Sequence, residues 1–395
     1  MNAALRRLRG NLRKIAAYRF LSDFYLLLPV LIPYYHACGL TATDIFIVQA
    51  SYSLTIMLFE IPSGYLSDVL GRRTTLLLGA ILMPLALTLY ALSTTLPYFI
   101  AAEIILAIAG SMRSGTDSAM LFDTLTATGE EERYTEIEGR AEAFLRYGTA
   151  VSSLIGGALA LYFLRLPFYA NILSGLLMVA VAFPLVEPPR AEKASGKWPI
   201  TEMGTVVRSV LTDRSFVGPA LLFALVGSVG VAAVWAYLLR FEAAGLSPLW
   251  SGLLFACFQL ASAFGSRASH LMAAGAKGRM PAYIFIIPMV LFLFAVDDAA
   301  LIAPVACLHA LIWGLSTPYL LAKMNACCGA AYRATSLSTA TMLTRLFNVI
   351  LMPLIGLIVD ATSLACGFLF LAAVLTAGTL VALRLLVIGE KEAAL

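Results

Sequence analysis

Long apolar runs, each bounded by turn residues or charges, recur along the whole chain and dictate its fold class. They fall at residues 15–38, 42–69, 74–95, 98–125, 137–163, 167–187, 215–241, 248–274, 281–297, 300–325, 334–360 and 364–388. About 20 apolar residues let a helix cross a bilayer, and a spanning helix satisfies its own backbone hydrogen bonds. With 61% hydrophobic and only 13% charged residues, an ordinary soluble domain is excluded. The sequence therefore predicts an all-α membrane protein with twelve transmembrane helices.

The distribution of basic residues sets the expected orientation. Of 27 Lys and Arg residues, most lie in the loops of one side, whereas Arg165 and Arg240 lie near the other. Because cytoplasmic loops are enriched in Lys and Arg, we expect a multi-pass membrane protein with both termini in the cytoplasm. The N-terminal segment lacks the small-residue cleavage site of a removable signal peptide. The net charge of +4 is explained by these loops and predicts no nucleic-acid partner.

The longest polar interruption divides the apolar runs into six and six. It is rich in Pro, Ser, Gly and Lys and ends in an amphipathic piece at 200–211. We expect an N-terminal six-helix bundle at 1–187, a cytoplasmic linker at 188–214 and a C-terminal six-helix bundle at 215–395. Two such halves are typical of transporters that carry internal repeats.

A short polar segment, Gly64 to Arg73, separates the second and third runs. We predict a tight loop at the membrane surface. Gly64 and Gly71 would let the chain reverse and let two helices approach closely. Asp68 would lie among cations that pair its charge.

This segment resembles the signature loop of the major facilitator superfamily, in which glycine, aspartate, glycine and two basic residues recur between helices 2 and 3. The matching positions, which we call the latch loop, are Gly64, Leu66, Asp68, Gly71, Arg72 and Arg73. The resemblance implies the twelve-helix facilitator fold, a monomer, and a cytoplasmic latch between two halves in which Asp123 pairs with Arg72 or Arg73. Glu60, one turn earlier, is expected to brace the loop. A fainter echo without the acid occupies Gly265, Arg267, Gly275, Lys277, Gly278 and Arg279.

Ionisable residues inside the runs indicate a cavity or a partner, because a charge near the bilayer centre costs roughly 2.5–3.5 kcal/mol. Arg19 and Asp23 are four residues apart, on one face of the first helix. Asp23 is our first candidate for proton coupling, since burial and a nearby cation act oppositely on its protonation. A permanently paired salt bridge is the equal alternative. Glu103, the second candidate, stands where many facilitator exporters carry an arginine; it could instead partner a basic group in helix packing.

Other polar and aromatic residues in the runs are candidates to line a substrate cavity. They are Arg19, Arg113, Asp117, Arg146, Trp235, Gln259, His309, Trp313, Arg345 and Asn348. Four interior arginines would suit a substrate that bears a carboxylate. A hydrogen-bonded interior position is the alternative for His309.

Small residues gather in the fifth run, at Gly139, Gly148, Ser152, Ser153, Gly156 and Gly157. The pattern resembles the antiporter motif of drug–proton exchangers, in which a Gly-Pro pair stands in place of Ser152 and Ser153. The resemblance favours export, although the missing proline weakens the case for antiport. Tight packing against a neighbouring helix is the other explanation.

The sequence has no phosphate-binding P-loop and no soluble domain large enough to hold one. We therefore expect no cofactor and no metal site, and transport that draws on a proton gradient. The leading hypothesis is proton-coupled efflux, by alternating access across a bacterial cell inner membrane, of a small organic compound, drug-like or an anionic metabolite such as a carboxylate siderophore. Metabolite uptake by facilitated diffusion or proton symport is the alternative. A membrane receptor or scaffold that moves no substrate is a third.

Overall fold

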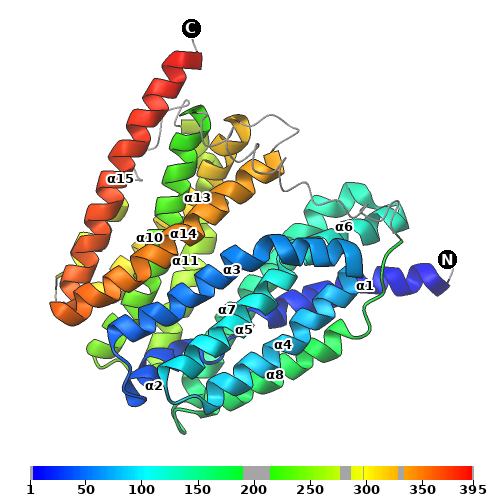
Figure 1. Cartoon of the computed structure of the whole chain (residues 1–395), viewed down its shortest axis with the longest axis horizontal. Helices are drawn as coiled ribbons and strands as arrows, with labels where there is room; N and C mark the ends of the chain where they lie inside the picture. The colour runs from blue at the N-terminus through cyan, green and yellow to red at the C-terminus, as the bar shows by residue number, and fades with distance from the viewer. Residues whose placement is uncertain (1–2, 190–213, 276–285, 297, 328–332, 394–395) are drawn as a thin grey trace. The chain divides into compact units, whose positions relative to one another are not determined.

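The computed structural model of the chain describes residues 3–189, 214–275, 286–296, 298–327 and 333–393. Every regular element in these ranges is a helix, and the described part of each predicted apolar run contains one helix or a broken one (Figure 1). The helices are α1 Ala3–Ser22, η1 Leu28–Val30, α2 Leu31–Ala37, α3 Ala42–Leu70, α4 Arg72–Leu92, α5 Leu96–Arg113, α6 Thr116–Thr128, η2 Glu131–Arg133, α7 Tyr134–Leu159, α8 Leu166–Ala182, α10 Arg214–Ala243, α11 Pro248–Gly275, α12 Ile286–Phe294, α13 Ala299–Cys327, α14 Arg333–Ala361 and α15 Leu364–Ala393.

Many of these helices have the length and the apolar composition of membrane-spanning segments. Among the described residues, eight helical stretches are long and apolar enough to cross a bilayer, and α8 is a shorter apolar helix. Proline occupies the first turn of both α5 and α8, where its missing N–H leaves no intrahelical bond unmade. The expected linker at 188–214 lies outside the described ranges except for residues 188, 189 and 214. Lys277, Gly278 and Arg279 lie wholly outside them.

Two of the expected helices are broken, and both breaks carry a charge. The helix expected at 15–38 ends at Ser22, so Asp23 lies in the turn that follows and not on a helical face with Arg19. The helix expected at 98–125 ends at Arg113 and restarts at Thr116, after a glycine in the left-handed region (Gly115, φ 71°). Expecting continuous helices at these two places was wrong, because apolar run length detects neither the non-helical residues 23–27 nor the reversal of φ at Gly115.

The latch loop is shorter than its sequence indicates. Helix α3 continues through Gly64 and Asp68 to Leu70, and the chain reverses at Gly71 alone, with φ at 109°. A side chain is strongly disfavoured at that φ, so the position requires glycine. A Cβ on Gly64 would meet no atom of the described residues within 4 Å, so close packing within unit 1 does not account for this glycine.

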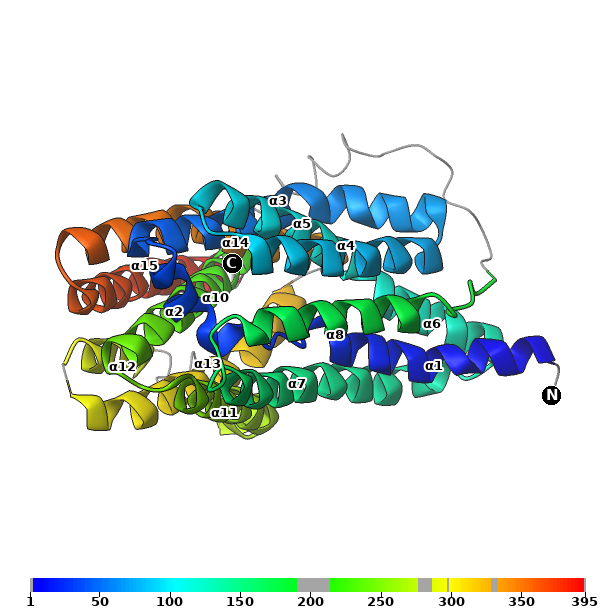
Figure 2. The same ribbon diagram turned by 90° about the horizontal axis from the view of Figure 1, so that it is seen from below.

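The helices form two compact units. Unit 1 comprises residues 1–40, 51–197 and 246–256, and unit 2 comprises 41–50, 198–245 and 257–395. In unit 1, α4 packs against α5 and α8, while α1 packs against α6, α7 and α8 (Figure 2). In unit 2, α10 packs against α13, α14 and α15, and α12 packs against α13 and α15. The first residues of α3 are assigned to unit 2 and the first residues of α11 to unit 1; the bundle boundaries at 187 and 215 stay a prediction.

Candidate functional site

A buried ion cluster centred on Arg19 lies in unit 1. The Arg19 Nε is 2.8 Å from Oδ2 of Asp117, and its Nη2 is 2.9 Å from Oε1 of Glu138. The same Nη2 donates to the Ser118 hydroxyl at 2.8 Å, and that hydroxyl donates to Glu138. The Arg19 side chain is only 3% exposed. This guanidinium therefore joins α1, α6 and α7 through charged hydrogen bonds.

A second ion pair bridges the two helix breaks. The Arg113 Nη2 lies 3.3 Å from Oδ1 of Asp23, and its Nη1 donates to the Ser22 hydroxyl at 3.2 Å. The partner of Asp23 is thus Arg113, at the end of α5, and not the arginine one turn away on α1.

Together these contacts bring three carboxylates, Asp23, Asp117 and Glu138, to two arginines, Arg19 and Arg113. One Glu138 oxygen, Oε2, is buried without a hydrogen-bond partner in the part of the chain that the structure describes, and so is Nη1 of Arg19. Buried polar atoms left unpaired are costly and rare. The cluster is therefore a place where a proton, a water or a substrate group would find partners.

Glu103 lies apart from this cluster, in a chain of hydroxyl groups. Its side chain is on α5, and the residue is 5% exposed. Tyr90 of α4 donates to its Oε1 at 2.6 Å, and the Tyr35 hydroxyl is 2.5 Å from that of Tyr90. Phe99 and Phe168 pack on the tyrosine rings. A carboxyl group so enclosed can exchange a proton through these hydroxyls.

The latch residues converge where α3 meets α4. The Arg72 side chain contacts Asp68 at 2.6 Å, Ser67 at 2.9 Å and Asp123 at 3.4 Å, so the structure has the ion pair with Asp123 that the family resemblance implies. The Arg73 side chain instead donates to the Phe183 carbonyl at 3.0 Å. Glu60 accepts from the Ser114 hydroxyl at 2.9 Å, so it contacts the break between α5 and α6.

Sequence reasoning missed Glu187, which completes this junction. Its two carboxylate oxygens accept the backbone N–H groups of Arg72 and Arg73 at 2.9 and 2.7 Å. These N–H groups lie at the positive end of α4, where a carboxylate stabilises the helix. A Cβ on Gly71 would stand about 3.0 Å from this carboxylate, a second reason for glycine there. No local motif indicates such a cap, because Glu187 is more than a hundred residues away.

The small residues of α7 permit close backbone contacts within unit 1. A Cβ at Gly148 would overlap the Phe20 carbonyl, one at Gly156 the Leu26 carbonyl, and one at Gly157 would lie 2.6 Å from the Pro248 carbonyl. Ser152 and Ser153 are fully buried, and their hydroxyls donate to the Thr149 carbonyl. Gly139 differs, since a Cβ there would meet no atom of the residues that the structure describes within 4 Å. Packing thus accounts for Gly148, Gly156 and Gly157 and not for Gly139.

In unit 2 two of the candidates, His309 and Trp313, belong to an aromatic cluster. The Tyr237 hydroxyl lies 2.8 Å from Nδ1 of His309, and the His309 ring stacks on Trp313. Phe258, Phe294 and Phe368 pack on Tyr237. His309 is 1% exposed. Its hydrogen bond and its burial agree with the interior, structural alternative for this histidine.

The remaining candidates differ in what they contact. Asn348 is fully buried on α14, and neither polar atom of its amide has a partner among the described residues; the same holds for Nε of Arg345, one turn earlier. Gln259 and Trp313 are half-buried, and Trp235 is buried. Arg146 has a half-exposed side chain 3.3 Å from Glu142 on its own helix. Arg345 and Asn348 therefore have buried polar atoms left for a ligand among the described residues.

Sequence comparison places these features in a known group. The profile of the Major Facilitator Superfamily matches residues 20–350. Over 208 residues, 53% of this chain, the sequence is 24% identical to the quinolone resistance protein NorA of Staphylococcus aureus, 52% of which is covered. It is 23% identical over 190 residues to an uncharacterized transporter of the same type from Methanocaldococcus jannaschii, with 48% of each chain covered. The match thus spans about half the length of these curated relatives.

Solved structures share the fold across nearly the whole chain. The nucleoside transporter NupG superposes with a TM-score of 0.78 at 14% identity, covering 98% of this chain and 99% of that one. A bacterial homologue of the human lysosomal transporter Spinster, inward-facing and unoccupied, gives a TM-score of 0.73 at 16% identity, with 97% and 95% covered. At these identities the likeness extends to the fold alone.

Proposed function

We propose that this chain, which belongs to the major facilitator superfamily, exports a small organic compound across a bacterial inner membrane in exchange for protons. The family assignment makes it a transporter rather than an enzyme, embedded in a membrane and acting on a small molecule. The direction and the proton coupling are our proposal. Its support is the partial likeness to a quinolone resistance protein and a buried carboxyl group, Glu103, bonded to a chain of tyrosine hydroxyls.

Glu103 is our leading proton carrier. A carboxylate enclosed by apolar surroundings is expensive, whereas a protonated carboxyl group is not. Tyr90 and Tyr35 provide hydroxyl groups that can donate to the charged form and relay a proton to it. Alternating access would change how far water reaches this chain in the two states, and so would change its proton occupancy.

Asp23 is the second candidate, with a different mode of action. Its contact to Arg113 is long, at 3.3 Å, and both residues lie at helix breaks that a change of state can rearrange. Because three carboxylates share two arginines here, a proton on one of them balances the charge of the cluster. Glu138 belongs to this cluster and is a candidate that the sequence did not reveal.

The substrate is a small organic compound, drug-like or carrying a carboxylate. Arg19, Arg113 and Arg146 already pair with acids, which leaves fewer free cations than the sequence indicates. Arg345 and Asn348 retain unpaired polar atoms in the described part of the chain, and they are the groups we assign to substrate binding. One cation and one amide would orient one carboxylate or carbonyl group.

The test is pH-gradient-driven flux in proteoliposomes, over a panel of quinolones, other drugs and carboxylate metallophores. We expect a substrate to move against its gradient in the wild-type protein. Glu103→Gln should retain substrate exchange but lose the response to the proton gradient, and Asp23→Asn should weaken that response. Glu132→Gln, an exposed acid of η2, is the matched control and should behave as the wild type.

The same assay tests the direction and the alternative. Accumulation driven by protons moving with the substrate would identify a symporter that imports a metabolite. Flux that ignores pH in the wild type and both variants would identify a facilitator, and would contradict proton coupling. Substrate binding without any flux would favour a receptor.

A further inference from the structure

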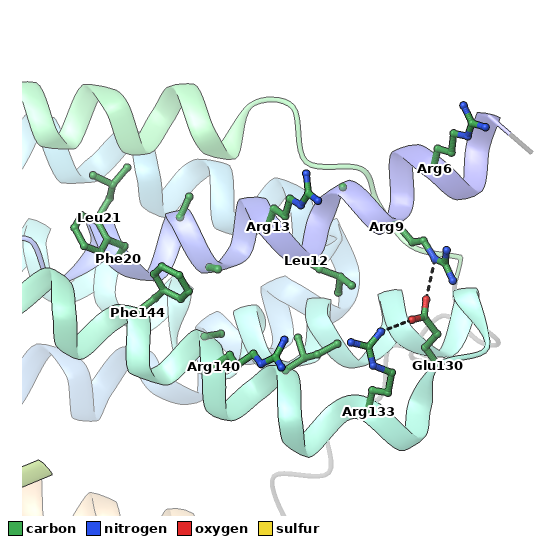
Figure 3. A pocket seen from close by; sticks show the side chains of 15 residues that line it. Arg6, Arg9, Leu12, Arg13, Phe20, Leu21, Glu130, Arg133, Arg140 and Phe144 are labelled. Carbon is green, nitrogen blue, oxygen red and sulfur yellow. Dashed lines mark hydrogen bonds and ion pairs between the residues drawn. The ribbon is translucent and has the colours of Figure 1, made fainter. Parts of the chain in front are cut away.

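A groove at one end of unit 1 carries far more positive than negative charge. It has a volume of about 1160 Å³ and lies between α1, η2 and α7 (Figure 3). Its charged lining consists of Arg6, Arg9, Arg13, Arg133, Arg140 and one acid, Glu130. On α1 the arginines at 6, 9 and 13 follow helical spacing along one face. None of these arginines belongs to the ion clusters described above.

The single acid of the groove forms ion pairs with two of its arginines. Glu130 lies 2.8 Å from Arg9 and 2.7 Å from Arg133. Although burial alone would raise it, hydrogen bonds from Arg133 and Arg9 hold the pKa of the Glu130 carboxyl below its usual value. Arg140 pairs with Glu136, at 2.6 Å. Within the described residues, Arg6 and Arg13 form no ion pair. The groove therefore retains cations that an outside anion can neutralise.

The inner wall of the groove is apolar. It is lined by Leu12, Ala16, Ala17, Phe20, Leu21, Ile137, Ala141 and Phe144. Figure 3 shows Phe144 directed toward α1, beyond the charged groups. From Phe144 an exposed apolar stripe continues along α7, through Tyr147, Val151, Leu154 and Ile155. A ligand that used the whole feature would have an anionic head and a long apolar tail.

We propose that this groove binds an anionic phospholipid, with the headgroup phosphate held by the arginines of the lining, Arg13 and Arg140 among them, and an acyl chain along the α7 stripe. Arginine matches the geometry of phosphate oxygens, and basic pockets beside membrane helices attract anionic headgroups. A soluble phosphate would use the arginines but gain nothing from Phe144 and the stripe. The charge pattern and the apolar continuation together select the lipid.

The test is native mass spectrometry of the full chain in detergent, titrated with phosphatidylglycerol or with phosphatidylcholine. We expect the wild type to retain phosphatidylglycerol more tightly. Each of Arg13→Gln and Arg140→Gln should weaken this binding about five-fold, from the free energy of one basic side chain at an anionic lipid surface. Arg7→Gln is the matched control, because Arg7 is exposed on α1 and does not line the groove.

Two further experiments distinguish a bound phospholipid from other ligands of the groove. Phe144→Ala should weaken phosphatidylglycerol binding but leave any binding of glycerol 3-phosphate unchanged. If glycerol 3-phosphate displaces the lipid at equal concentration, the site takes a free anion and the proposal is wrong. Equal retention of the two lipids, or equal loss in Arg7→Gln and Arg13→Gln at unchanged thermal stability, would also overturn it.

Discussion

The two units hold their buried polar groups in different ways. In unit 1 the buried polar groups are charged, and one cation contacts two acids, as Arg19 does with Asp117 and Glu138. In unit 2 the buried contact that we describe is neutral, between Tyr237 and His309, and aromatic rings surround it. Removing one partner from a buried ion cluster leaves a bare charge, whereas a neutral pair can be replaced by apolar groups at little cost. The stability of unit 1 therefore depends on charge balance in a way that the Tyr237–His309 contact of unit 2 does not.

The largest effect is expected from Arg19→Ala. The substitution leaves Asp117 and Glu138 without their cation, and breaking a buried ion pair costs about 3–5 kcal/mol. The thermal unfolding midpoint in detergent should fall strongly. A loss below about 1 kcal/mol would mean that water already screens the cluster, as it does for exposed pairs, and the contrast between the units would fail.

Glycine substitutions on α7 come next. Gly156→Ala would place a methyl group against the Leu26 carbonyl, and overpacking of this kind costs about 1–3 kcal/mol. Gly139→Ala is the control on the same helix, because no atom in the described ranges lies within 4 Å of its added Cβ. It should be neutral or stabilise the helix by about 0.5–1 kcal/mol. Equal effects of the two variants on the unfolding midpoint would contradict the packing explanation.

A smaller effect is expected in unit 2. Tyr237→Phe removes the hydroxyl that contacts Nδ1 of His309, and an unpaired buried nitrogen costs about 1 kcal/mol or more. Combining it with His309→Leu should recover part of that loss, since neither polar partner then remains. If the double variant is less stable than the sum of the single losses, the pair is not a replaceable neutral contact.

The smallest effect belongs to Glu130→Gln and depends on pH. Since the pKa of Glu130 is held below its usual value, its contribution is present above the pKa of the unfolded state. That contribution is lost as the pH falls through the lowered pKa of the folded state. The unfolding midpoint of the variant should therefore lie slightly below the wild type at neutral pH and converge with it in acid. A constant difference across that range would contradict the ion pairs to Arg9 and Arg133.

The sequence predicted those parts of the fold that depend on composition and short spacing. Apolar runs located the helices, and the latch pattern located Arg72 and its acid, Asp123. The breaks after Ser22 and Arg113 escaped detection because a few residues of altered backbone leave hydrophobicity unchanged. These two breaks also bring Asp23 to Arg113, which is therefore its ion-pair partner.

The polar partners could not be predicted, because they come from distant parts of the chain. Glu138 contacts Arg19 across 119 positions, and Glu187 contacts Arg72 across 115. Tyr90 looks like any aromatic residue of an apolar helix until its hydroxyl is placed on Glu103. Glu103 itself was a candidate from the sequence, since an acid within an apolar run stands out whatever its neighbours are.

The cap that Glu187 places on α4 has a practical consequence for dividing the protein into fragments. Three segments meet at the turn at Gly71, namely the end of α3, the start of α4 and the chain that follows α8. The last of these supplies the Glu187 carboxylate that accepts the first N–H groups of α4. A first fragment that ends at residue 189 keeps the Glu187 contact to α4, whereas one that ends with α8 at Ala182 loses it. For a split version of this transporter, co-expressed as two pieces, the cut site should therefore be chosen beyond Glu187.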